Sequence, residues 1–142
     1  GESFMASFYV RGLIQGYMGK LSEAEQDFKK FLEWDPKNWA ALNDLTWIYF
    51  QQGEYKKAEE TARLGLEIDP ENPWLLNSLG VSLLNQNRKE EAREFFLKAK
   101  SSAANLTAKD WQRAYPGNNP ESAKHGLENI KKIIASNLEL AD

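Results

Sequence analysis

An internal repeat of 34 residues is the feature of this sequence that most constrains its fold. Asp-Pro occurs at Asp35-Pro36 and again at Asp69-Pro70, and the same shift brings further columns of similar residues into register. The columns that run through three copies are Ala24, Ala58 and Ala92; Gly12, Thr46 and Gly80; Phe28, Ala62 and Phe96; and Phe31, Gly65 and Ala99. Self-similarity at a fixed period is the signature of a repeat architecture, so we expect stacked units of similar structure.

Each unit carries the start and stop signals of two helices. Asn38 and Asn72 stand where an N-cap is preferred and predict first helices over 39–52 and 73–86. Pro73 suits a first helical turn, because its missing N–H would have no partner there. The first helices are expected to end at residues that tolerate positive φ, namely Gly19, Gly53 and Asn87.

The second helices are bounded by different signals. The pattern Ser22-x-x-Glu25 is a capping box and predicts the start of the second helix in unit one. Pro36 and Pro70 end the second helices of units one and two, because a helix interior cannot accept the proline ring.

The repeated columns predict how these helices pack. Alanine lets the two helices of a pair approach closely, and the rings of Phe28, Phe31 and Phe96 are expected to fill the space between successive pairs. No single pair can bury its own apolar face, so a core forms only when several pairs stack. The predicted fold class is all-α, a right-handed α-solenoid of antiparallel helix pairs.

With its 34-residue period, Leu79-Gly80, Tyr49 and the terminal prolines, the chain resembles the tetratricopeptide repeat family over about 5–104. Arg11 stands where that family usually has Leu, and Thr46 where it has Gly. We expect one domain over 1–142, with repeats at about 5–38, 39–72 and 73–106 and a degenerate fourth unit over 107–142.

The fourth unit is expected to cap the solenoid. Thr107-x-x-Asp110 predicts a short helix carrying Trp111 and Tyr115, with Trp111 sealing the stack, and 116–119 is a loop signal. A last helix from Pro120 has apolar positions at Leu127, Ile130, Ile133, Ile134 and Leu138. The 34-residue register places Gly126, Ile130 and Ile133 on the alanine and aromatic columns.

Charge is distributed unevenly between the two helix types. Arg11 is the only charged residue in 4–18, Asp44 is the only one in 39–52, and 73–87 has none. A helix with so little charge is buried or faces an apolar surface. In the family that the chain resembles, first helices line a concave groove. The resemblance therefore implies a groove lined by Tyr9, Leu13 and Gly16; by Asn43, Trp47 and Phe50; and by Trp74, Asn77, Val81 and Leu84.

This surface predicts a non-catalytic module that binds an extended peptide or a partner helix. Aromatic side chains would supply most of the affinity, and Asn43 and Asn77 would bond the ligand backbone. Trp47 and Phe50 have an equally good interpretation as core residues. Relatives that clamp a C-terminal carboxylate use cations, which the groove positions lack. The alternatives are a homo-oligomer whose groove is self-occupied, or an accessory domain of a larger enzyme or membrane-anchored assembly protein.

Composition excludes several other functions. Cysteine is absent and His125 is the single histidine, so we expect no metal site, no cofactor and no catalytic residue. A net charge of −3 gives no basic face for nucleic acid, and no apolar stretch is long enough to insert in a membrane. Glu59-Glu60 and Glu90-Glu91 are expected to be solvated. The start at Gly1 indicates a piece of a longer protein, and the compartment is unknown.

Overall fold

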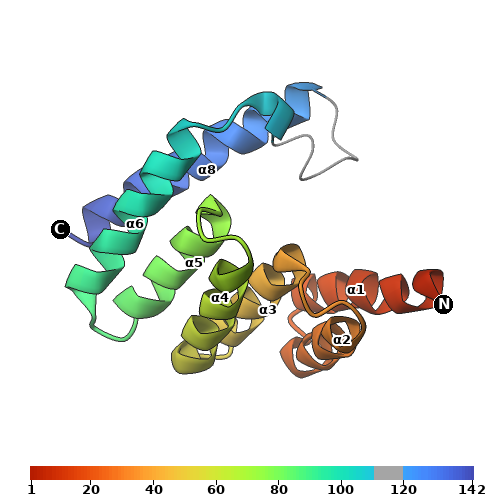
Figure 1. Ribbon diagram of the computed structural model, residues 1–142. Helices are drawn as coiled ribbons and strands as arrows, with labels where there is room; N and C mark the ends of the chain where they lie inside the picture. The colour runs from red at the N-terminus through yellow and green to blue at the C-terminus, as the bar shows by residue number, and fades with distance from the viewer. Residues whose placement is uncertain (111–119) are drawn as a thin grey trace. The chain divides into compact units, whose positions relative to one another are not determined.

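The computed structural model describes residues 1–110 and 120–142, and the regular structure in both ranges is helical (Figure 1). The helices form two compact units, Gly1–Pro70 and Glu71–Asp142. Unit 1 contains α1 (Glu2–Tyr17), α2 (Leu21–Trp34), α3 (Trp39–Gln51) and α4 (Tyr55–Ile68). Unit 2 contains α5 (Pro73–Leu84), α6 (Lys89–Ala104) and α8 (Pro120–Leu140). As predicted, α1 pairs with α2, α3 with α4 and α5 with α6.

The predicted ends of the first helices are confirmed. The side chain of Asn38 accepts a hydrogen bond from the backbone N–H of Ala41 (3.0 Å), and Asn72 accepts one from Leu75 (3.1 Å). The residues with positive φ in the described chain are those predicted: Gly19 at 76°, Gly53 at 77° and Asn87 at 62°. Local sequence therefore sets the boundaries of α3 and α5.

The predicted capping box of the second helix is wrong. Helix α2 begins at Leu21 with Lys20 as its N-cap, and no side chain bonds the free backbone N–H groups there. Ser22 therefore lies inside the first turn. Glu25 instead pairs with Lys29 one turn later, at 2.7 Å.

The alanine and aromatic columns form the core. Ala24, Ala58 and Ala92 are fully buried, as are Phe28 and Phe96. Phe28 clusters with Leu45, Ile48 and Tyr49 of the next pair, as predicted. The rings of Phe28 and Phe96 also each lie against a glycine of their own pair. A Cβ atom added to Gly80 would lie 2.4 Å from Phe96 Cε1, and one on Gly12 would lie 3.1 Å from Phe28 Cε1.

Thr46, which departs from the glycine column, has a compensating neighbour in the repeat. The equivalent of Phe28 and Phe96 in α4 is Ala62, and both Thr46 and Ala62 are buried. A larger residue in the first helix thus coincides with a smaller one in the second. Close packing explains the exchange, since the volume between two paired helices is fixed.

Arg11, the second departure, is held by an acid on the paired helix. Its guanidinium makes two hydrogen bonds to the carboxylate of Asp27 in α2, at 2.8 and 2.7 Å. Asp27 is buried. A two-pronged ion pair therefore replaces the apolar contact that the leucine column makes in the other repeats.

The repeat register holds only in part in α8. Leu127, Ile130 and Ile134 are buried, whereas Ile133, which the register places on the aromatic column, is 40% exposed. Helix α8 packs mainly on α6 and also touches α5, as α3 packs on α2 and touches α1. It therefore occupies the position of a first helix, and the buried face is set by that packing rather than by the second-helix columns.

The start of the fourth unit agrees with its prediction. Thr107 N–H donates to the carboxylate of Asp110 at 2.8 Å, and Asp110 N–H donates to the Thr107 hydroxyl at 3.2 Å. The two residues form a reciprocal cap before residues 108–110, which are helical. Trp111, Tyr115 and the predicted loop at 116–119 lie outside the described residues.

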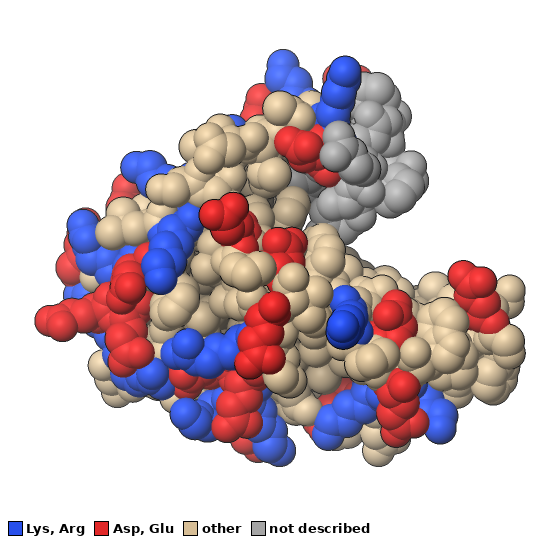
Figure 2. All heavy atoms as spheres, in the orientation of Figure 1, with Lys and Arg blue, Asp and Glu red and all other residues tan. Residues whose placement is uncertain are grey.

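Charged side chains of both signs gather over α2 and α4 in unit 1 and over α6 in unit 2 (Figure 2). Many of them form ion pairs one turn apart, such as Lys30–Glu33 and Lys98–Glu94. Glu60, Glu90 and Glu91 are exposed as expected, but Glu59 is buried. Its place between Ala58 and Ala62 puts it at the edge of the buried face, and Lys56 and Arg63 pair with its carboxylate.

Candidate functional site

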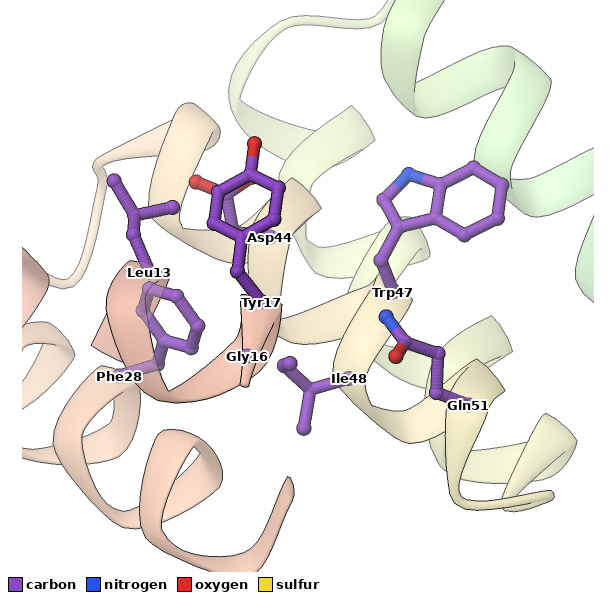
Figure 3. Close-up of a pocket in the computed structure, with 8 residues that line it drawn as sticks. All are labelled: Leu13, Gly16, Tyr17, Phe28, Asp44, Trp47, Ile48 and Gln51. Atoms are coloured by element: carbon purple, nitrogen blue, oxygen red, sulfur yellow. The ribbon is translucent and has the colours of Figure 1, made fainter. Parts of the chain in front are cut away.

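A hollow of about 360 Å³ opens on the face that α1 and α3 share in unit 1 (Figure 3). Its lining is Leu13, Gly16 and Tyr17 from α1, Phe28 from α2, and Asp44, Trp47, Ile48 and Gln51 from α3. The lining residues stand at positions i, i+3 and i+4 in α1 and at i, i+3, i+4 and i+7 in α3, so each set shares one helical face. In Figure 3 the side chains of Tyr17, Asp44 and Trp47 extend to the same side of the two helices.

Gly16 lines the hollow without filling it, because it has no side chain. A Cβ atom at this position would lie 3.1 Å from Ile48 Cδ1, so glycine lets α1 and α3 come together without filling the space above them. Phe28 and Ile48 are buried and form the base. Tyr17, which is 91% exposed, stands at the rim. The hollow therefore has an apolar base and a solvent-exposed rim.

Asp44 is the charged residue of this lining. The hydroxyl of Tyr9 on α1 donates a hydrogen bond to its carboxylate. Burial raises the pKa of the Asp44 carboxyl from 3.8 to about 6, and the hydrogen bond from Tyr9 offsets part of that increase. Near neutral pH the hollow therefore presents a partly desolvated negative charge.

Several cations of unit 1 form ion pairs with other acids. Arg11, the cation of α1, pairs with Asp27. Lys29 pairs with Glu25, and Lys30 with Glu33, both within α2. Among the described residues, no Lys or Arg forms an ion pair with Asp44.

The structure brings three of the predicted unit 1 groove residues to the hollow, namely Leu13, Gly16 and Trp47. Tyr9 reaches it only through its bond to Asp44, because its ring packs on Phe28 and Phe31. Phe50 packs between Trp47 and Tyr55, with ring centroids 5.4 and 5.3 Å away, and against the core. Asn43 is half-buried outside the lining.

In unit 2 the predicted groove residues lie on α5. Trp74, Val81 and Leu84 are half-buried. Asn77 is only 3% exposed, and its side-chain oxygen accepts a hydrogen bond of 2.8 Å from the amide of Asn137 on α8. The expectation that Asn77 offers an open amide to a ligand is therefore not met, because α8 covers it.

Neither a membrane span nor a metal cluster emerges from the part of the chain that the structure describes. Within 1–110 and 120–142, every helix is too short or too polar to cross a bilayer. In the same ranges, Asp, Glu and His side chains do not gather in groups of three or more that would hold a metal ion. His125 is exposed on α8.

Comparison with known families supports the repeat architecture. Two sequence profiles of the tetratricopeptide repeat match the chain, one over residues 17–67 and the other over 62–94. Together they span more than half of it. The chain belongs to the tetratricopeptide repeat family. A comparison with curated protein sequences gave no match.

Solved structures of tetratricopeptide repeat proteins share the all-helical fold. PcrH from Pseudomonas aeruginosa is 18% identical with a TM-score of 0.82, and the match covers 99% of this chain and 93% of PcrH. PcrH in complex with the chaperone-binding region of PopD is 18% identical with a TM-score of 0.72, covering 96% and 94%. The type III secretion chaperone SycD of Yersinia enterocolitica, in complex with a peptide of the translocator YopD, is 16% identical with a TM-score of 0.70, covering 95% of each chain. At these identities the likeness shows the fold.

The sequence did not predict Tyr17, Asp44, Ile48 and Gln51 as lining residues, and it placed Phe28 only in the core. Asp44 did carry a signal, because it is the lone charge of an otherwise uncharged first helix. Tyr17 and Gln51 occupy one column of the 34-residue period together with Asn85, but the three residue types differ, so the column gives no signal. Their role follows only from the space between the two helices.

Proposed function

We propose that this chain is a non-catalytic protein–protein interaction module that binds an extended segment or a helix of a partner on its first-helix faces. The observation that carries the proposal is the hollow on α1 and α3, with its apolar base and its exposed aromatic rim. Trp47 and Tyr17 are of the residue type that anchors ligands at interaction surfaces. Trp74, Val81 and Leu84 on α5 are assigned the same role in unit 2.

Two further observations support a polypeptide ligand. The volume of about 360 Å³ accommodates one or two side chains of a bound segment. PcrH and SycD, which share this fold, were solved with segments of PopD and YopD respectively. Asn77 has no part in the proposal, because its amide already bonds Asn137.

The test is selection of ligands from a random library of 12-residue peptides displayed on phage, with the immobilised chain as bait. Enriched peptides are then synthesised, and their Kd is measured for wild type, Tyr17→Glu and Leu64→Glu. Both variants put an acid at an exposed apolar position and preserve the core. Tyr17 borders the hollow, whereas Leu64 lies on the second helix α4.

We expect Tyr17→Glu to weaken binding at least tenfold and Leu64→Glu to leave the Kd within about twofold. Circular dichroism of both variants establishes that they remain helical. A library that yields no binding peptide, or peptides equally sensitive to both substitutions, contradicts the assignment of the ligand surface to α1 and α3.

One observation favours a second candidate, assembly with another copy of this chain. Helix α1 exposes several large apolar side chains, namely Phe4, Val10, Ile14, Tyr17 and Met18, each at least 53% accessible. Arg11, seven residues from both Phe4 and Met18, is the charged residue on this side of the helix, and its guanidinium is bonded to Asp27. Exposed apolar faces of this size mark interaction sites more often than chance surface.

A further inference from the structure

The hollow of unit 1 contains an acid that forms no ion pair with a cation of residues 1–110 or 120–142. Asp44 is half-buried, and its described partner is the neutral hydroxyl of Tyr9. Arg11, Lys29 and Lys30 pair instead with Asp27, Glu25 and Glu33, and none of the ion pairs found among the described residues includes Asp44. A carboxylate removed from water without a cation costs free energy, which a positively charged ligand group would recover.

The side chains around Asp44 suit the aliphatic stem of such a group. Leu13 and Ile48 provide an apolar base, while Trp47 and Tyr17 offer the faces of two aromatic rings. Ammonium and guanidinium groups are attracted to aromatic faces, most strongly to that of tryptophan. Gln51 at the edge adds a carbonyl oxygen that can accept a hydrogen bond.

We propose that the hollow selects a lysine or arginine of the bound polypeptide, whose charged end pairs with Asp44 while its stem lies against Trp47 and Leu13. This inference rests on the proposed function and names its specificity. Tyr9 acts as a positioning residue, because its hydroxyl holds the Asp44 carboxylate on the side of α3 that faces α1. The partner is a basic peptide segment.

The experiment compares two peptide pools selected from the same phage library, one on wild type and one on Asp44→Asn. The amide is nearly isosteric with the carboxylate and still accepts a hydrogen bond from Tyr9, so the variant removes the charge alone. Glu33→Gln, an exposed acid of α2, is the matched control for the loss of one negative charge.

We expect the wild-type and Glu33→Gln pools to share one position enriched in Lys or Arg and the Asp44→Asn pool to lack it. A wild-type peptide resynthesised with norleucine for Lys, or citrulline for Arg, should bind wild type at least tenfold more weakly. The same replacement should change binding to Asp44→Asn less than threefold, since the charge pair is already absent.

The outcomes separate this inference from the proposed function. Peptides that lose binding with Tyr17→Glu but show equal Lys and Arg content in both pools overturn the charge selection and leave the binding surface in place. Enriched basic peptides that bind Asp44→Asn as tightly as wild type also overturn it. A library from which no peptide is recovered overturns both.

Discussion

At the scale of single residues, Asp44 is the most important side chain, and its pKa depends on the residues packed around it. Asp44 is a short acid on a helix of otherwise uncharged residues, and the approach of α1 takes it partly out of water. Its hydrogen bond from Tyr9 only partly offsets the loss of hydration, so its pKa rises to about 6. The same desolvation that makes Asp44 suitable for binding a cation makes it costly in the free protein.

We predict that Asp44→Asn stabilises the free protein in a pH-dependent way. The folded pKa of about 6 exceeds the unfolded value of 3.8, so the contribution of Asp44 to stability is greatest below pH 4 and is lost as the pH rises through 6. The variant should gain up to roughly 3 kcal/mol at pH 8 and almost nothing at pH 4. Urea unfolding at both pH values measures this difference. An equal gain at both would contradict the burial of the charge.

A second prediction concerns the glycine opposite Phe96. Gly80→Thr alone should destabilise the protein by about 2 kcal/mol or more, because even a Cβ would lie 2.4 Å from the ring. Phe96→Ala alone should cost about 3–5 kcal/mol through the cavity that it leaves. The double variant reproduces the Thr46 and Ala62 pair of α3 and α4 and should cost at least 1 kcal/mol less than the sum. Strict additivity in urea unfolding would show that the two positions do not share one space.

At the scale of helices, α8 shows that an element can keep a repeat's spacing and lose its role. Ile130 and Ile133 were predicted on the columns of a second helix, yet α8 packs on α6 as a first helix would. The buried set of Leu127, Ile130 and Ile134 follows from that position. Helix α8 also covers Asn77 and supplies a hydrogen-bond donor, Asn137, to its amide oxygen.

Two adjacent isoleucines test the register of α8. Ile134→Ala should lower the free energy of unfolding by about 2–4 kcal/mol, because the side chain is 1% exposed and a cavity remains. Ile133→Ala removes the same atoms from a position that is 40% exposed and should cost less than about 1 kcal/mol. Thermal or urea unfolding of both variants makes the comparison. The reverse order would restore the register predicted from the repeat.

At the scale of the whole molecule, the surfaces of the first and second helices differ in their content of charged residues. Lys, Arg, Asp and Glu of the second helices pair among themselves, whereas first helices expose apolar and aromatic residues. A surface of mixed charge keeps a protein soluble without attracting a particular partner. The first-helix faces, where charged residues are sparse, are therefore where both candidate functions are located.

Self-association through α1 has a direct test. If a second copy covers this helix, wild type should show a mass that rises towards the dimer between about 1 and 100 μM, a range typical of modest apolar interfaces. Ile14→Asp should then remain a monomer of about 16.2 kDa throughout. Sedimentation velocity measures both. A wild-type monomer at every concentration would leave peptide binding as the sole candidate.

Much of the fold could be predicted from local sequence, while the site could be predicted only in part. Asn38, Asn72, Gly19 and Gly53 fix helix ends through bonds and φ angles that involve only nearby backbone, so pattern alone located them. Leu13 and Trp47 were found because the helical period fixes which face they share. Asp44 was noted for its charge, but its role depends on a neighbouring helix 35 residues away.

The sequence by itself determined the helix pairs, their caps and the small and large columns, because these depend on short-range bonding and on a repeated period. Only the tertiary structure decided which of these residues are exposed and can contact a ligand. It closed Asn77 under α8, turned Ile133 to solvent, buried Glu59 and shaped the hollow around Asp44. The reason is physical: burial and pKa depend on what other elements bring against a side chain, and a one-dimensional period does not specify those distances.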